Sequence, residues 1–71
     1  MNPQELIRLQ AYLRKVFGTK TLSVRARPKK TDSAEVYVGD EFIATISVDD
    51  EDGDRAYQFQ MAILEVDLEG F

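Results

Sequence analysis

The spacing of apolar residues changes from a helical period to a strand period near residue 20. Five apolar residues before that point recur at intervals of three and four, as one face of a helix requires. They are Leu6, Leu9, Leu13, Val16 and Phe17. Asn2 suits the N-cap, Glu5 follows it by three residues, and Gly18 is a typical left-handed stop. We therefore expect one helix over residues 2–17.

From residue 21 onward, apolar and polar residues alternate. Leu22 and Val24 point to one face of the predicted strand, and Arg25 and Arg27 point to the other. The next residue, Pro28, has no N–H to donate to a ladder. The pattern predicts a strand over 21–27 with a basic outer face, at the edge of a sheet.

A hairpin is predicted after a polar loop at 29–32, because Gly39-Asp40 separates two apolar runs. This pair suits a type II′ or I′ turn. A two-residue loop pairs Val38 with Glu41 and Val36 with Ile43. In this register, one face of the hairpin carries Tyr37, Phe42, Ala44 and Ile46. The other face, which is also apolar, carries Ala34, Val36, Val38 and Ile43.

A fourth strand is predicted after an acidic loop at 49–54. Its alternating apolar residues are Tyr57, Phe59, Met61 and Ile63. The alternation changes phase at Ile63-Leu64 and continues through Val66 and Leu68, which predicts a bulge or bend. The elements together predict a single α+β domain over residues 1–71, an N-terminal helix packed on an antiparallel four-stranded meander.

Charge is distributed unevenly along the chain. The first 30 residues hold eight Lys/Arg and one acid (+7), and the remaining 41 hold one Arg and twelve acids (−11), which gives the net charge of −4. Two oppositely charged halves favour pairing with a second copy, or two faces for two partners.

The composition argues against several chemistries. Without Cys or His, the usual zinc, copper and iron ligands and the common nucleophile–base pairs are missing. The four glycines are too widely spaced for a phosphate loop. We therefore predict no catalytic residue, metal, cofactor or small-molecule substrate. No run of about 18 apolar residues and no apolar signal segment is present, so we expect no membrane span and a cytoplasmic location.

The acidic loop at 49–54 suggests a calcium site, but its spacing does not fit one. With Gly53 at the turn position of a calcium loop, Val48 and Phe59 fall where the first and last ligands belong. Two readings stay open: a solvated loop that turns at Asp52-Gly53, or weak, non-specific binding of divalent cations.

A basic segment offers a second candidate site, for phosphate groups of a nucleic acid or another polyanion. Its residues are Arg25, Arg27, Lys29 and Lys30. Tyr57 and Phe59 would stack bases beside them. The alternative is an edge strand whose charges block pairing with other chains, with both aromatics in the core. A small polyanion binder is therefore the alternative function.

Surplus apolar surface gives the main functional prediction. The helix covers one sheet face, and a contiguous apolar patch left exposed usually marks an interface. The interface candidates are Ile7, Val36, Val38, Ile43, Leu64, Val66 and Leu68. We predict a protein–protein interaction module, a homodimer steered by the opposite charges of its halves, with Phe71 as an additional anchor. The alternative is that the C-terminal segment folds back over the patch within the monomer.

Four segments resemble an uncharacterised family of short alphaproteobacterial proteins, known only as a domain of unknown function. They are Arg27-Pro28-Lys29-Lys30, Asp32-Ser33-Ala34-Glu35-Val36-Tyr37-Val38-Gly39-Asp40-Glu41-Phe42-Ile43, Asp49-Asp50-Glu51-Asp52-Gly53-Asp54-Arg55 and Phe59-Gln60-Met61-Ala62-Ile63-Leu64. The resemblance implies a bacterial, stand-alone, cytoplasmic domain. It implies no activity, cofactor or catalytic residue.

Overall fold

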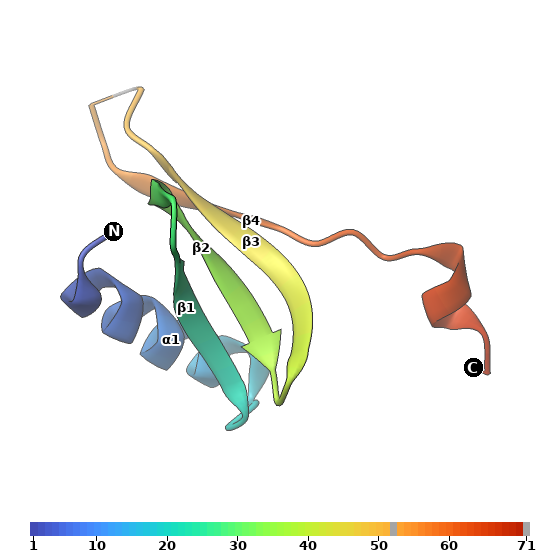
Figure 1. The fold of residues 1–71 in the computed structure, drawn as a ribbon. Helices are drawn as coiled ribbons and strands as arrows, with labels where there is room; N and C mark the ends of the chain where they lie inside the picture. Colours follow the sequence, from blue (N-terminus) through green and yellow to red (C-terminus); the bar gives the residue numbers. More distant parts are fainter. Residues whose placement is uncertain (52, 71) are drawn as a thin grey trace.

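One helix and four antiparallel strands follow each other along the chain (Figure 1). The elements are α1 (Pro3–Phe17), β1 (Leu22–Arg27), β2 (Lys30–Val38), β3 (Glu41–Asp49), β4 (Ala56–Gln60) and the 3-10 turn η1 (Glu65–Leu68). They come from a computed structural model that describes residues 1–51 and 53–70. The sheet has the order β1-β2-β3-β4, so the predicted α+β meander is confirmed.

Both ends of α1 carry the predicted caps. The Glu5 N–H donates to Asn2 Oδ1 at 2.8 Å, and the Asn2 N–H donates to Glu5 Oε1 at 3.1 Å. This capping box satisfies two N–H groups that the first helical turn leaves free. At the other end, Gly18 adopts φ +63° and its N–H donates to the Arg14 carbonyl. The local sequence therefore sets both helix boundaries.

The core lies where α1 packs against the sheet, chiefly over β1. Leu22, Val36 and Ile46 are its largest fully enclosed side chains. The complete core is Leu13, Leu22, Val24, Ala34, Val36, Ala44 and Ile46. Of the predicted helix stripe, Leu6 and Leu9 pack beside this core, whereas Val16 and Phe17 stay about half exposed. The helix stripe is therefore only partly covered.

The β2–β3 turn matches the sequence pattern. Gly39 has φ +61°, while Asp40 has a negative φ. These signs are those of a type II′ turn, in which the first central position favours glycine. Val38 pairs with Glu41, as predicted.

A bulge follows this turn and changes the predicted register. Tyr37 pairs with Phe42 as expected, but Val36 pairs with Ala44. Ile43 is therefore an extra residue on β3. Because the side-chain period of a strand is two, one extra residue reverses the faces of everything beyond it.

The predicted uncovered apolar face is wrong for this reason. Val36 is fully buried on the helix side of the sheet, beside Ala44. Val38 and Ile43 are partly buried and pack against the same core. The inward residues of β2 and β3 thus coincide, and the opposite face is left mainly to polar and aromatic side chains.

The connection between β1 and β2 is shorter than predicted. Lys30 already pairs with Arg27 across a register shift, so residues 30–32 belong to β2 and not to a polar loop. Pro28 ends β1, which lies at the sheet edge as predicted. The basic residues 27–30 therefore sit in a tight turn at one end of the sheet.

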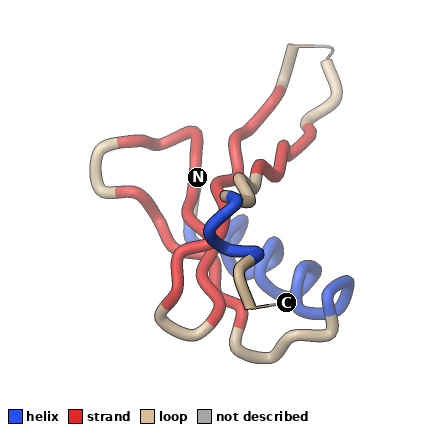
Figure 2. Tube along the Cα trace, turned by 90° about the vertical axis from the view of Figure 1, so that its right-hand side faces the viewer, coloured by secondary structure: helices blue, strands red, loops and turns tan. Residues whose placement is uncertain are grey.

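The chain leaves the sheet after Gln60, where β4 ends. The sequence predicted a bulge or bend at Ile63-Leu64, and the chain does leave the sheet near this point. Residues 61–64 pair with no strand in the described part of the chain. Residues 65–68 form η1 and not the alternating strand that was expected. We call residues 61–70 the C-terminal arm. The arm projects beyond the sheet, and Figure 2 looks towards it from its free end. The molecule consequently measures 43 × 24 × 23 Å.

Candidate functional site

The sheet face turned away from α1, here called the open face, carries a charged and aromatic cluster. The Arg25 guanidinium lies 4.0 Å from the centre of the Tyr37 ring, and this ring meets Phe42 edge-on at 5.7 Å. The Tyr37 hydroxyl donates to Glu35 at 3.1 Å, and Arg27 lies 3.9 Å from the same carboxylate. The hydrogen bond to Glu35 raises the pKa of Tyr37.

These contacts bear on the predicted polyanion site. The structure brings Arg25 and Arg27 to one face, yet each already has an intramolecular partner, a ring or a carboxylate. Lys29 and Lys30 lie exposed at the β1–β2 turn. The Glu35 carboxylate offsets part of the positive charge at Arg27, whereas the Tyr37 ring orients Arg25 without neutralising it.

The aromatic side chains predicted to stack bases lie elsewhere. Tyr57 bonds to Glu5 on α1, and Phe59 packs beside the core on the helix side. The aromatic pair that does accompany the arginines is Tyr37 and Phe42. The register expected from the sequence already placed both rings on one face, and their pairing is confirmed. The bulge could not be predicted, and it puts this face opposite the helix and not under it.

A groove runs between α1 and β4 on the helix side of the sheet. It exists because α1 packs chiefly over β1, while every residue of β4 except Phe59 stays exposed. Its volume is about 430 Å³. We call it the α1–β4 groove, and it is lined by Glu5, Arg8, Leu9, Tyr12, Leu13, Ile46, Tyr57 and Phe59. Apolar walls with a few charged groups at the rim are typical of binding sites.

Glu5 ties β4 to the helix at the rim of this groove. The Tyr57 hydroxyl donates to Glu5 Oε2 at 2.6 Å, and Arg55 Nη2 lies 3.0 Å from the same oxygen. The Tyr57 hydrogen bond, the Asn2 N–H and the charge of Arg55 hold the pKa of Glu5 below its ordinary value. The same bond raises the pKa of Tyr57. The Glu5 carboxylate is thus charged, and both of its oxygens have partners. It stabilises the fold and is poorly suited to transfer protons in a reaction.

The C-terminal arm carries the predicted interface residues that the structure leaves exposed. Leu64, Val66 and Leu68 are 59%, 61% and 59% exposed. Met61 and Ile63 on the same arm are also exposed. Met61 and Leu64 line a hollow that the arm shares with Phe42 and Ile43 of β3.

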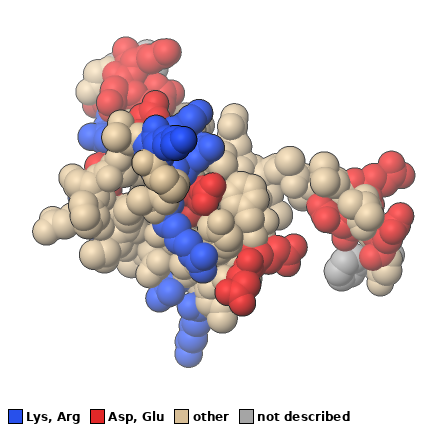
Figure 3. Space-filling model, in the orientation of Figure 1, with Lys and Arg blue, Asp and Glu red and all other residues tan. Residues whose placement is uncertain are grey.

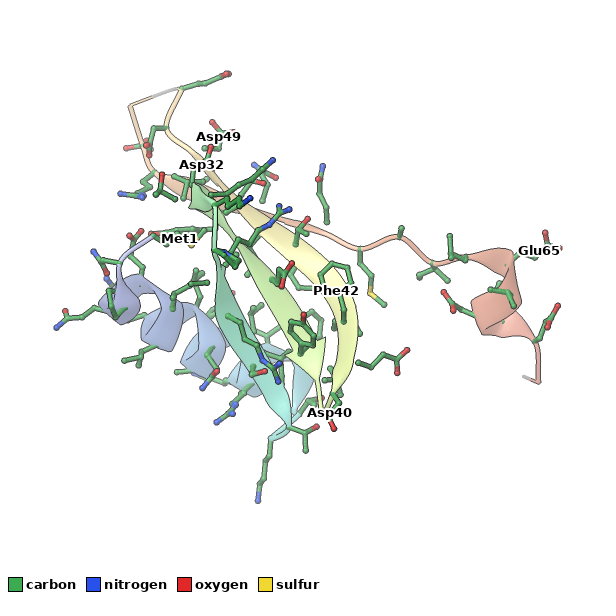
Figure 4. The ribbon with its side chains drawn as sticks, viewed as in Figure 1. Met1, Asp32, Asp40, Phe42, Asp49 and Glu65 are labelled. Carbon is green, nitrogen blue, oxygen red and sulfur yellow. The ribbon has the colours of Figure 1, made fainter. Side chains whose placement is uncertain are left out.

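The other predicted interface residues divide between surface and core. Ile7 is exposed on α1, and Figure 1 places that helix at the opposite end of the view from the arm. Val36 is buried, while Val38 and Ile43 are partly buried. The structure therefore does not assemble the predicted residues into one patch. Figure 4 shows Glu65, on the arm, far from the labelled residues of the sheet.

The acidic loop is held by local contacts. Asp49 Oδ1 accepts the Glu51 N–H at 3.1 Å, and Asp50 lies 3.8 Å from Arg55. Gly53 has φ +83° and its N–H donates to the Asp50 carbonyl. Within residues 1–51 and 53–70, no acidic cluster is arranged to hold a metal ion. The predicted Asp52-Gly53 turn lies partly outside the described residues, as does Phe71.

Charge is separated in space as well as along the chain. In Figure 3, acidic side chains gather at the loop after β3, near the β2–β3 turn and on the arm, and basic side chains lie over β1 and its ends. None of the helices in the described part of the chain is both long enough and apolar enough to cross a membrane.

Comparison with known proteins places the chain in a family. The model of a family described as protein of unknown function, DUF3126, matches residues 5–67. The chain belongs to the DUF3126 family. The DUF3126 match runs from the first turn of α1 through all four strands into η1, and it confirms the resemblance to an uncharacterised family. Comparisons with curated proteins and with solved structures gave no match.

Proposed function

We propose that this protein is a small, cytoplasmic, non-catalytic protein–protein interaction module that associates with a second copy of itself. The observation that carries the proposal is the exposed C-terminal arm. Five of its apolar side chains are between 49% and 64% exposed. Apolar side chains gathered on one exposed segment are a common feature of protein interfaces.

The arm also has a defined shape, which favours binding. The Leu64 N–H donates to Asp67 Oδ2 at 2.9 Å, and the Asp67 N–H donates to the Leu64 carbonyl at 2.9 Å. A second turn bond joins the Glu69 N–H to the Val66 carbonyl at 3.2 Å. Because these bonds fix η1 in advance, less conformational entropy remains to be lost when a partner binds.

Charge supports self-association in particular. The arm holds three acids and no base, while residues 1–30 hold eight bases and one acid. The acidic arm of each copy can therefore approach the basic residues of the other copy. This attraction raises the association rate, and repulsion between the two acidic arms disfavours a contact between them.

Sedimentation velocity tests the proposal, on samples from about 1 µM to several hundred µM, since association follows mass action. The wild-type chain should change from monomer to dimer over this range. The triple variant Leu64→Ser/Val66→Ser/Leu68→Ser should remain monomeric. Ile7→Ser is the matched control, because Ile7 is equally exposed but lies on α1, and it should dimerise like the wild type. A wild-type chain that stays monomeric at the highest concentration would refute the proposal.

A further inference from the structure

We propose that the C-terminal arm of one copy docks in the α1–β4 groove of a second copy, and that the exchange is reciprocal. This inference rests on the proposed function and names the surface that receives the arm. Four observations carry it: the apolar groove, the pattern of the arm, their opposite charges and the direction in which the arm leaves the sheet.

The groove offers a binding surface for aliphatic side chains. Leu9 and Tyr12 form its helix wall, and Ile46 and Phe59 form its sheet wall. Tyr12 is 63% exposed although it lines an apolar hollow. Covering this wall removes apolar surface from water, which stabilises a complex in proportion to the area covered.

The arm presents aliphatic side chains of a suitable size. Apolar and acidic residues alternate over residues 64–69, so each aliphatic side chain has a carboxylate beside it. Val66 and Leu68 are short enough to enter a groove of about 430 Å³. Because η1 has three residues per turn, Glu65 lies on the same side as Leu68, and its carboxylate would meet the rim of the groove together with that leucine. A pattern of apolar anchors with a polar surround is typical of an interface centre and its edge.

Charge selects this groove over a neutral apolar surface. α1 carries three bases and one acid, and Arg8 lines the groove directly. The one acid, Glu5, is already paired with Arg55 and bonded to Tyr57. Arg55 is also shared with Asp50 of the acidic loop, so Arg8 on the helix wall is the groove residue whose charge is opposite in sign to the three acids of the arm.

The direction of the arm points to a second copy as the partner. β3 bends at the bulge around Ile43, and pairing with β4 stops at Gln60. From there the arm continues past the sheet, away from α1, as Figure 1 and Figure 2 show. The groove lies on the α1 side of the sheet, so the arm as placed is aimed away from its own groove. Two copies related by a two-fold axis would exchange arms with identical contacts in both directions.

Paramagnetic NMR on the full-length chain tests the docking directly. The chain has no cysteine, so Glu69→Cys allows one nitroxide label at the end of the arm. The spin-labelled chain, without nitrogen-15, is mixed with nitrogen-15 wild-type chain, so only contacts between copies broaden the observed signals. We expect broadening at Leu9, Tyr12 and Phe59 and none at Gly39 in the distant β2–β3 turn.

The outcomes separate this inference from the proposed function. A dimer whose broadening lies on the open face would overturn the groove as the receptor while the interaction module stands. A monomer would overturn both. A nitrogen-15 Glu69→Cys chain that itself carries the label, diluted to the monomer, reports contacts within one copy. Broadening of the groove in that sample alone would show that the arm folds back on its own body, and would also overturn the exchange.

Two matched variants of α1 test the same contact by affinity. Tyr12 and Ile7 are 63% and 66% exposed on one helix, but only Tyr12 lines the groove. Tyr12→Glu places a negative charge where the acidic arm docks, so the dimer dissociation constant should rise by about tenfold or more. Ile7→Glu should leave it unchanged. Equal effects of the two substitutions would overturn the inference, and circular dichroism checks that both variants fold.

Discussion

Leu22 and Leu64 are the same residue type in opposite surroundings. Leu22 is 1% exposed in the core between α1 and the sheet, and Leu64 is 59% exposed on the C-terminal arm. Truncating each leucine to alanine removes the same atoms. The difference between the two losses in free energy of unfolding therefore reports the surroundings alone.

The structure sets the size of each loss. Leu22→Ala leaves a cavity in the core and should cost about 3–5 kcal/mol. Leu64 has lost only part of its contact with water, so Leu64→Ala should cost less than about 1 kcal/mol. A domain of 71 residues has a free energy of unfolding of roughly 4–10 kcal/mol. Leu22→Ala should consequently remove a large part of the stability, and Leu64→Ala very little.

Urea unfolding followed by far-ultraviolet circular dichroism measures both losses. The protein is kept dilute, because a dimer would add concentration-dependent stability to the wild type. Leu22→Ala should lower the midpoint by about 1 M urea or more without a change in m-value. The shift for Leu64→Ala should be less than half as large. Equal shifts in dilute solution would mean that the arm packs on its own body, which would refute the argument from its exposure.

Three further predictions concern the Glu5 contacts, the hairpin turn and the open face. The pKa of Glu5 is lowered from 4.5 in the fold, so the stability this carboxylate contributes is present above that pH and is lost as the pH falls through the folded pKa. The urea midpoint of the wild type should fall between neutral and acidic pH, and Glu5→Gln should make this fall smaller. Tyr57→Phe should raise the pKa of Glu5 in an NMR titration. A Glu5→Gln variant with the wild-type pH profile would count against the contact between Glu5 and Tyr57. Gly39→Ala should lower the free energy of unfolding by about 1–2 kcal/mol because φ is +61°, and urea unfolding at wild-type stability would show that the turn relaxes. Since Arg25 and Arg27 are engaged by Tyr37 and Glu35, fluorescence anisotropy should detect no oligonucleotide binding at about 0.15 M salt; a steeply salt-dependent affinity that Arg25→Gln abolishes would contradict this.

Features set by neighbours in the chain could be predicted from the sequence. Asn2 and Glu5 mark the start of α1 and Gly18 marks its end, because capping bonds join residues at most a few positions apart. The Gly39 turn fixed the first pairs of the hairpin in the same way. The order of the strands followed from short connections.

Features set by distant residues could not be predicted. The bulge at Ile43 has no local signature, and it alone moved Val36 from a predicted interface into the core. The bond from Tyr57 to Glu5 joins positions 52 residues apart. The change of phase near Ile63 did indicate that the chain departs from the sheet. It did not indicate the 3-10 turn, because residues 64–69 alternate like a strand and only the absence of a partner strand leaves them free to form a turn.

The extra residue on β3 also has an evolutionary consequence. A deletion of Ile43 would leave the pairs Tyr37–Phe42 and Val36–Ala44 in a continuous ladder. A straighter β3 would then offer its free edge to the chain beyond Gln60, and the segment that now stands apart would be absorbed as ordinary sheet. On the proposed function, the deletion of this one residue would thus remove the segment through which two copies associate.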